Sequence, residues 1–157
     1  MSDVYERLRA RLDELAVGLP QTENKIEIKL LKRLFTETEA DFFVQLHPLL
    51  EAPDDVAKRL NREPGEVAGL MEQMAKKGLL FRKRDGDRVR YAAVPYVVGI
   101  FEFQVKSMDE AFARDNEAYF EQAFLASAQS FKTPVLRTVP INRKIVAEWP
   151  IAPYEDV

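Results

Sequence analysis

The sequence contains no cysteine and only one histidine, His47. The absence of cysteine excludes thiol nucleophiles, disulfide bonds, zinc knuckles and thiolate-held iron–sulfur clusters. One histidine leaves little for metal binding or imidazole-based catalysis, and we expect His47 to be a partly exposed helix residue just before Pro48. The chain also lacks a glycine-rich phosphate loop and a serine elbow. These absences predict a protein that is not an enzyme and holds no metal or cofactor of its own.

Long hydrophobic runs and an excess of one charge are also missing. No apolar run approaches the roughly 20 residues of a membrane-spanning helix, and the N-terminus enters an amphipathic helix rather than a secretory leader. We therefore expect a cytoplasmic protein that does not associate with membranes. The net charge is −3. Basic and acidic residues number 7 and 6 in residues 1–35, 10 and 11 in 36–94, and 6 and 9 in 95–157, so charge alone does not predict nonspecific adhesion to nucleic acid.

The middle of the chain, residues 36–95, has the pattern of a winged helix-turn-helix. A capping box at Thr36 opens a first helix, which should end at Ala52-Pro53, and Pro53 begins a second helix that reaches Leu60. A third helix covers 64–77 and is closed by Gly78. Strands at 79–83 and 89–94 follow, joined by a tight turn at Asp85-Gly86 or Gly86-Asp87. We predict a mainly α fold with a small β-wing.

Additional helices and a tail flank this unit. Helices at 3–16, capped by Asp3, and at 25–35 should pack on the core as residues 1–35, although a short strand could open the second. Residues 96–131 predict a helical pair. Its first part, 96–105, favours a helix over a strand, and Asp109 caps the next helix. Residues 132–157 contain four prolines and predict an extended tail, or a linker to a further domain.

The third helix and the wing are the candidate nucleic-acid contacts. In DNA-binding winged helices the third helix reads base edges and the wing touches phosphates. Here three exposed glutamates on the helix would oppose a polyanion, whereas the basic wing would attract one. The wing cations could also be ordinary solvated residues. The candidate contacts with nucleic acid or a partner are Arg62, Gln73, Lys76, Lys77, Arg82, Lys83, Arg84, Arg88 and Arg90.

The second half of the chain is unusually aromatic for two short helices. Such a stripe is either a core or a subunit interface, and an interface predicts a homodimer. A pocket between the helical pair and the winged helix, as in a small-ligand sensor, is a further alternative. The candidate dimer interface comprises Tyr96, Phe101, Phe103, Phe112, Tyr119, Phe120 and Phe124.

Five segments carry a family resemblance: VYERL at 4–8, EIKLLKRLFT at 27–36, MAKKGL at 74–79, AVPYVVGIFEF at 93–103 and WPIAPYE at 149–155. Together they resemble the winged-helix N-terminal region of ferredoxin-like 4Fe-4S iron–sulfur proteins of anaerobic bacteria, most specifically over 93–103. In that family the cysteine-rich cluster-binding segments follow this region. The resemblance therefore implies a non-catalytic interaction and dimerisation module that docks a redox module to a partner protein.

No cluster ligand carries over to this chain, because it has no cysteine. The resemblance places any 4Fe-4S cluster in a C-terminal region that this sequence does not contain. A broader similarity to the MarR-type winged-helix regulators rests on the helix–helix–wing order alone. It implies the alternative function of a DNA-binding transcriptional regulator.

Overall fold

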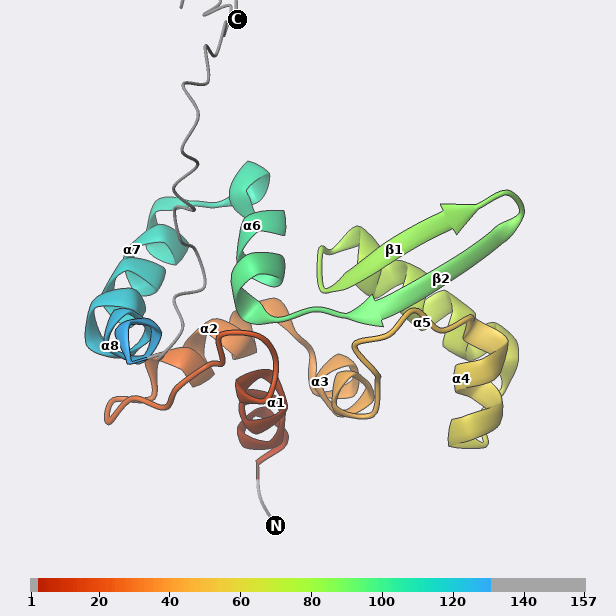
Figure 1. The fold of residues 1–157 in the computed structure, drawn as a ribbon, viewed down its shortest axis with the longest axis horizontal. Coiled ribbons are helices and arrows are strands. Elements are labelled where there is room, and N and C mark those ends of the chain that lie inside the picture. Colours follow the sequence, from red (N-terminus) through yellow and green to blue (C-terminus); the bar gives the residue numbers. More distant parts are fainter. Residues whose placement is uncertain (1–2, 131–157) are drawn as a thin grey trace, which may run out of the picture.

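A computed structural model describes residues 3–130 of the chain (Figure 1). The architecture is mainly helical, with one antiparallel two-stranded sheet. The expected extended tail or linker at 132–157 lies outside the described residues. The elements are α1 (Val4–Asp13), α2 (Ile26–Leu34), α3 (Glu37–Val44), α4 (Pro53–Leu60), α5 (Pro64–Lys76), β1 (Leu80–Asp85), β2 (Arg88–Ala93), η1 (Tyr96–Ile100), α6 (Phe101–Phe103), η2 (Val105–Ser107), α7 (Glu110–Tyr119), η3 (Phe120–Phe124) and α8 (Leu125–Gln129).

The winged helix-turn-helix consists of α3, α4, α5 and the β1–β2 hairpin, which confirms the predicted fold class. Leu80 pairs with Ala93 and Asp85 with Arg88, so the turn is the two-residue loop Gly86-Asp87. Gly86 has φ +61°, and a positive φ at the first loop position only is the pattern of a type II′ hairpin turn. This turn matches the twist of the strands, so the wing extends as a regular ribbon.

Local signals place the ends of these helices. The Thr36 hydroxyl accepts from the Glu39 N–H while the Glu39 carboxylate accepts from the Thr36 N–H, which completes the capping box. Pro53 and Pro64 occupy the first turns of α4 and α5. Asn61, at φ +51°, turns the chain between those two helices. Each of these signals involves residues no more than four apart, and each is confirmed.

The first helix of this unit is shorter than predicted. It ends at Val44, and the following residues run along the edge of β2 instead of continuing to Ala52. The His47 carbonyl accepts from the Ala93 N–H at 2.9 Å, and the Glu51 N–H donates to the Tyr91 carbonyl at 2.8 Å. These strand contacts satisfy backbone groups that a longer helix would have used internally. His47 is therefore exposed in a loop, not in a helix.

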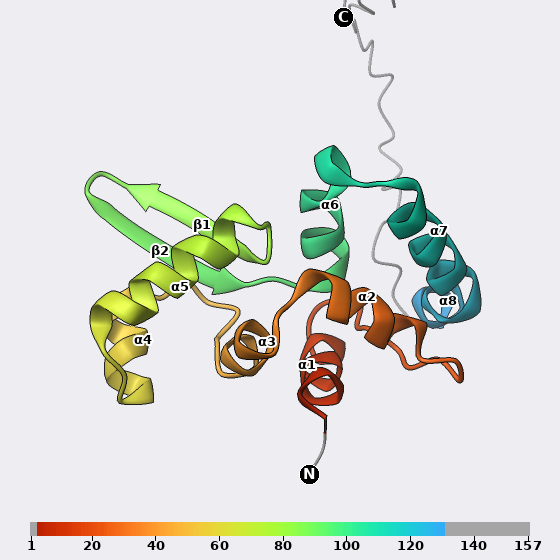
Figure 2. The same cartoon turned by 180° about the vertical axis from the view of Figure 1, so that it is seen from behind.

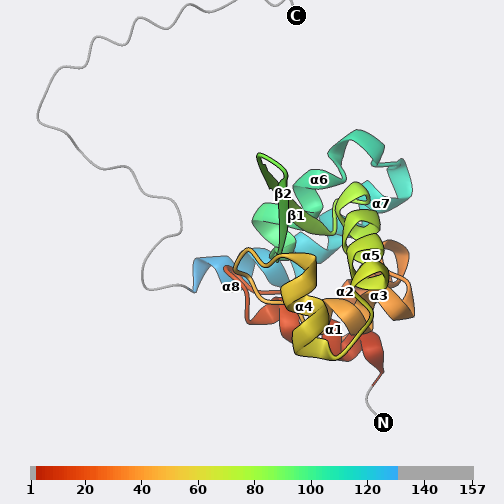
Figure 3. The ribbon, with the colours of Figure 1, turned by 90° about the vertical axis from the view of Figure 1, so that its right-hand side faces the viewer.

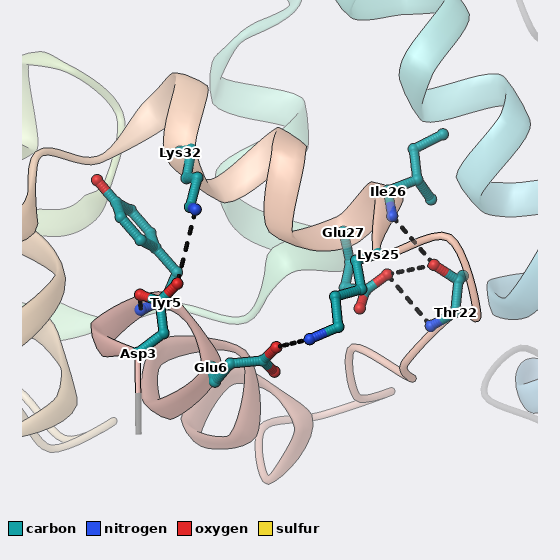
Figure 4. A network of polar contacts seen from close by, with 8 residues as sticks. All are labelled: Asp3, Tyr5, Glu6, Thr22, Lys25, Ile26, Glu27 and Lys32. Atoms are coloured by element: carbon teal, nitrogen blue, oxygen red, sulfur yellow. Dashed lines mark hydrogen bonds and ion pairs between the residues drawn. The ribbon is translucent and has the colours of Figure 1, made fainter. Parts of the chain in front are cut away.

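The N-terminal helices α1 and α2 pack against each other and are joined by polar contacts (Figure 4). Lys25, which precedes α2, pairs with Glu6 of α1 at 2.6 Å. The Thr22 hydroxyl accepts from the Ile26 N–H at 3.1 Å and donates to the buried Glu27 carboxylate at 2.5 Å. The N-cap residue of α2 is Lys25, and the Thr22 hydroxyl satisfies the first helical N–H. A strand had been an alternative here, but residues 26–34 are helical throughout.

The segment after the wing is only partly helical. Val97, Val98 and Gly99 have non-helical backbone angles, and helical geometry begins at Ile100. The expected helix over 96–105 is therefore wrong for its first residues. The Gly99 N–H donates to the Glu102 carboxylate and the Ile100 N–H to the Pro95 carbonyl, so the helix begins only after Gly99. The Asp109 carboxylate caps α7 by accepting from the Phe112 N–H at 2.8 Å. From there α7, η3 and α8 form one continuous rod.

The winged helix and the α7–α8 rod lie at opposite ends of the molecule, with α1 and α2 between them (Figure 1). Helix α1 contacts α3, and α2 contacts α7. Seen from behind, α5 lies across the hairpin (Figure 2), and in a side view α5 and the hairpin stand next to each other (Figure 3). One hydrophobic cluster joins all three parts. Within residues 3–130, none of the helices combines the length and apolar character needed to cross a membrane.

Candidate nucleic-acid interface

Helix α5 holds one of its glutamates against the wing. The Glu72 carboxylate accepts from the Tyr91 hydroxyl at 2.6 Å and from Arg82 Nε at 2.8 Å. These hydrogen bonds, first from Tyr91 and then from Arg82, lower the pKa of Glu72. Glu72 therefore joins α5 to both strands and is only partly exposed. The expectation that three glutamates would face a polyanion is wrong for this residue.

The N-terminal end of α5 remains acidic but internally paired. The Glu63 carboxylate accepts from the Glu66 N–H at 2.7 Å, and hydrogen bonds from backbone N–H groups lower its pKa. Glu66 pairs with Arg62, and the Arg62 guanidinium lies 5.3 Å from the centre of the Phe42 ring. Arg62 is therefore held by Glu66 and the Phe42 ring. This placement does not support Arg62 as a contact with nucleic acid or a partner.

The C-terminal end of α5 carries two lysines with different surroundings. Lys77 Nζ lies 2.6 Å from Oε2 of Glu39, a carboxylate that is almost fully buried. This ion pair ties the end of α5 to the start of α3, so Lys77 is occupied. Lys76 is exposed and lies 3.7 Å from Glu72. Gln73 is also exposed on the outer face of the helix.

The wing carries both paired and unpaired cations. Arg82 is held by Glu72, and Arg90 lies 3.8 Å from Asp85. Lys83, Arg84 and Arg88 are exposed, and none of them has a carboxylate partner within residues 3–130. Because side chains alternate along a strand, Arg84 lies on the α5 face of the hairpin and Lys83 on the opposite face. The tip therefore presents cations on both faces.

One side of the wing is unsuited to a polyanion. A cleft of about 680 Å³, the acidic cleft, lies between the start of α4 and β2. Its charged lining residues are Asp54, Asp55, Asp85, Asp87, Arg88 and Arg90. Four carboxylates against two guanidinium groups disfavour phosphate inside the cleft, whereas Arg88 is also exposed beside the turn of the wing. A nucleic acid would have to approach the outer face of α5 and the wing tip.

A second cleft of about 680 Å³, the basic cleft, separates the winged helix from the segments that follow it. Its charged lining side chains are all cationic, and Phe81, Phe103 and Phe112 supply apolar surface. Arg33 lies 5.2 Å from the centre of the Phe112 ring and pairs with Asp109 at 2.5 Å. The cations are Arg33, Lys76, Lys77 and Arg82.

Sequence reasoning missed Arg33 as a lining residue of the basic cleft. Its neighbours Phe112 and Asp109 follow more than seventy residues later in the chain. No local pattern announces such a contact, because α2 meets α7 only through the tertiary fold. The cleft occupies the place expected for a small-ligand pocket.

The candidate dimer-interface residues divide by burial. Tyr96, Phe112, Tyr119 and Phe124 are buried within one chain, so they fill its core and offer no surface to a partner. Tyr96 donates to the Asn116 carboxamide oxygen at 2.5 Å, and burial raises the pKa of this phenol. The residues that keep exposed surface are Phe101, Phe103 and Phe120. The homodimer itself stays a prediction.

A metal ion finds no ligand set among the described residues, and a thiolate-held cluster finds none in the sequence. The chain has no cysteine, and among residues 3–130 no three histidine, aspartate or glutamate side chains come together as metal ligands. The residues present therefore do not fit a 4Fe-4S cluster. No step of the protein's chemistry is assigned to one.

Comparisons with known proteins add little to this geometry. No protein-family model matches the chain, and no curated protein matches its sequence. A MarR-family transcriptional regulator from Rhodococcus sp. RHA1 is similar in structure, at 15% identity over 76% of each chain and a TM-score of 0.34. A probable transcriptional regulator from Pseudomonas aeruginosa is 19% identical over 80% of this chain and 83% of its own, with a TM-score of 0.28. The assignment of the winged-helix fold therefore rests on the arrangement of α3, α4, α5 and the β1–β2 hairpin.

Proposed function

We propose that this chain is a DNA-binding winged-helix module that contacts the phosphate backbone through the tip of its wing. The observation that carries this proposal is the set of exposed wing cations without a carboxylate partner in the described part of the chain: Lys83, Arg84 and Arg88. Most other basic residues around α5 and the hairpin are neutralised by a neighbour. Unpaired cations at the end of a protruding ribbon are free to replace the counterions of DNA.

The outer face of α5 is suited to close approach. A side-chain carbon added at Gly69 would meet nothing within 4 Å, and Gln73 lies one turn further along the same face. This low surface lies between two exposed charged residues of the same helix, Glu66 one turn before Gly69 and Lys76 one turn after Gln73. We infer that phosphate contacts dominate affinity and that discrimination between base sequences is weak.

The test is a binding titration with a labelled DNA duplex at several salt concentrations, followed by fluorescence anisotropy. Three phosphate contacts predict a slope of about −3 for log K against log salt. The double variant Arg84→Gln/Arg88→Gln should make that slope shallower by about 2. A matched control, Lys106→Gln/Arg114→Gln, removes two exposed cations from the other end of the molecule and should leave the slope unchanged. Equal slopes for both variants would contradict the proposed wing contacts.

A second candidate function is a sensor of small anionic ligands, which the basic cleft favours. Four cations and three phenylalanine side chains line one cavity. Arg33, Lys77 and Arg82 already pair closely with carboxylates. Lys76 is therefore the cation that would bind the acid group of an aromatic ligand. We propose that binding of small anionic ligands, if the protein has this function, takes place in the basic cleft.

The probe for the cleft is 8-anilinonaphthalene-1-sulfonate, with the uncharged N-phenyl-1-naphthylamine for comparison. Lys76→Gln removes an exposed lining cation and should weaken binding of the sulfonate several-fold while leaving the neutral dye unaffected. Lys106→Gln serves as the control outside the lining. Equal loss of both dyes would point to a packing defect and count against the anion site.

The relation to iron–sulfur proteins rests on the resemblance of five sequence segments, and we keep it as a proposal of a redox-partner docking role. The reading frame downstream of Val157 tests it, since cysteines with ferredoxin spacing should follow. Homodimer formation is tested separately by size exclusion with light scattering. A monomeric mass at all concentrations would remove the dimerisation role.

A further inference from the structure

The far end of the molecule carries an apolar groove that neither DNA binding nor ligand binding uses, and it includes Phe101 and Phe120 of the candidate dimer interface. This α6–α7 groove has a volume of about 700 Å³. Its apolar surface comes from Phe101, Met108, Phe120 and Leu125. Leu125 is half exposed, and the other three are only partly buried. An exposed apolar groove rimmed by charged side chains is one kind of surface that binds a partner segment.

The border of the groove is acidic. Glu110, Glu117 and Glu121 line it, together with the single cation Arg114. Arg114 is taken up by Glu110 at 2.6 Å, whereas Glu117 and Glu121 form no ion pair within residues 3–130. The groove therefore fits a segment that is both apolar and basic.

The chain itself contains such a segment. Residues 132–147 include Lys132, Arg137, Arg143 and Lys144 and no acidic residue. The same stretch carries apolar residues at 135, 136, 139, 141, 145 and 146. Its charge and its hydrophobicity both complement the groove.

The geometry of the rod makes this contact reachable. Leu125 lines one end of the groove, and the described chain ends five residues later at Ser130. From Glu110 to Leu125 the rod spans about 23 Å at the rise of a helix. An extended strand covers that distance with about 7 residues, so residues 132–147 are long enough to return along it.

We propose that residues 132–147 bind back into the α6–α7 groove of their own chain, with their cations against Glu117 and Glu121. Trp149, the only tryptophan of the sequence, follows this segment after Glu148, and its fluorescence reports on the position of the segment. The absence of cysteine allows a single engineered cysteine to be labelled anywhere in the full chain.

The experiment is contact quenching of Trp149 by a bimane label in the full-length protein. A label at Ala113→Cys, in the groove, should quench the tryptophan strongly, and a label at the distant control site Lys58→Cys should not. Glu117→Gln/Glu121→Gln should lower the ratio of docked to free segment about five-fold. The matched control Glu23→Gln/Glu37→Gln, at exposed sites away from the groove, should leave it unchanged.

A mixing experiment distinguishes binding of the segment within its own chain from binding to a second copy. Bimane-labelled protein that also carries Trp149→Phe is mixed with unlabelled protein that retains the tryptophan. The proposal expects no quenching in this mixture. Quenching there would assign the segment to the groove of a second copy and overturn the proposal. Equal quenching from the two label positions in the unmixed protein would overturn it as well.

Discussion

At the scale of single residues, the Glu39–Lys77 pair shows how one carboxylate serves both a helix cap and a tertiary contact. Burial alone would raise the pKa of Glu39, but hydrogen bonds from Lys77 and from the Thr36 N–H outweigh it, so the pKa lies below its ordinary value of 4.5. A carboxyl group whose pKa is lowered by folding stabilises the protein above its unfolded pKa. That contribution is lost as pH falls through the folded pKa.

We predict that Lys77→Met lowers the free energy of unfolding by about 1–3 kcal/mol near neutral pH, because Glu39 is left charged, buried and unpaired. The loss should shrink at acidic pH, as the pH falls through the lowered pKa of Glu39 and the carboxylate becomes protonated. Urea unfolding at both pH values measures it. Lys76→Met changes the neighbouring exposed lysine and should have little effect. A loss for Lys77→Met that does not depend on pH would contradict the assigned role of the pair.

Two buried phenols offer a matched comparison of hydrogen bonds. Tyr96 donates to Asn116 inside the core, whereas Tyr119 donates to the Pro20 carbonyl at 3.1 Å in a partly buried site. Tyr96→Phe should cost about 1–3 kcal/mol of unfolding free energy, because the Asn116 oxygen is left without a donor and without water. Tyr119→Phe should cost less, since water can reach Pro20. Thermal or urea unfolding of both variants measures the difference, and the reverse order would contradict this account.

At the scale of elements, Gly78 links the end of α5 to the segment after the wing. Its φ is +73°, and an added side-chain carbon would lie 2.7 Å from the Cβ atom of Phe103. Gly86 in the wing turn has φ +61° but has open space around it. Both glycines are needed for their backbone angle, and only Gly78 is also needed for close packing.

We therefore predict that Gly86→Ala costs about 1 kcal/mol of unfolding free energy through backbone strain alone. Gly78→Ala should cost roughly 2–4 kcal/mol, because overpacking against Phe103 is added to the strain. Denaturant unfolding of both variants tests this, and equal costs would argue against the close approach of α5 and α6. In a Phe103→Gly background, which lacks the Cβ atom that Gly78→Ala would meet, the added cost of Gly78→Ala should be smaller.

At the scale of the whole molecule, the helical rod is joined to the rest by α2. Phe112 is buried where α7 meets α2, and Lys29 and Arg33 of α2 pair with Asp115 and Asp109. The hydrophobic cluster continues from the winged helix through α1 and α2 into this rod. Shared packing of this kind couples the unfolding of the parts.

We predict a single unfolding transition for residues 3–130, with coincident curves from far-UV circular dichroism and tyrosine absorbance. Phe112→Ala should lower the free energy of unfolding by about 3–5 kcal/mol while keeping one transition. Lys106→Gln, at an exposed site, is the control. Two separated transitions in the unaltered protein would show that the rod folds as an independent unit.

Local sequence determined much of the order of elements. The capping box at Thr36, the prolines that begin α4 and α5, Gly78 and the Gly86 turn all act between near neighbours, so their residue types are sufficient to predict a winged helix. The sequence also excluded thiolate chemistry, because composition alone settles that question. The boundary at Val44 was missed because the competing hydrogen bonds come from β2, which follows more than forty residues later.

Tertiary structure decided which charged residues remain free. In the sequence, Lys77, Arg82 and Lys83 are equivalent exposed cations. In the folded chain, Lys77 pairs with Glu39 of α3 and Arg82 pairs with Glu72 of α5. Lys83 has no such partner among the described residues. The basic cleft likewise exists only where α2, α5 and the later helices meet. Ion pairs and cavities depend on distances between elements, and local residue patterns do not contain those distances.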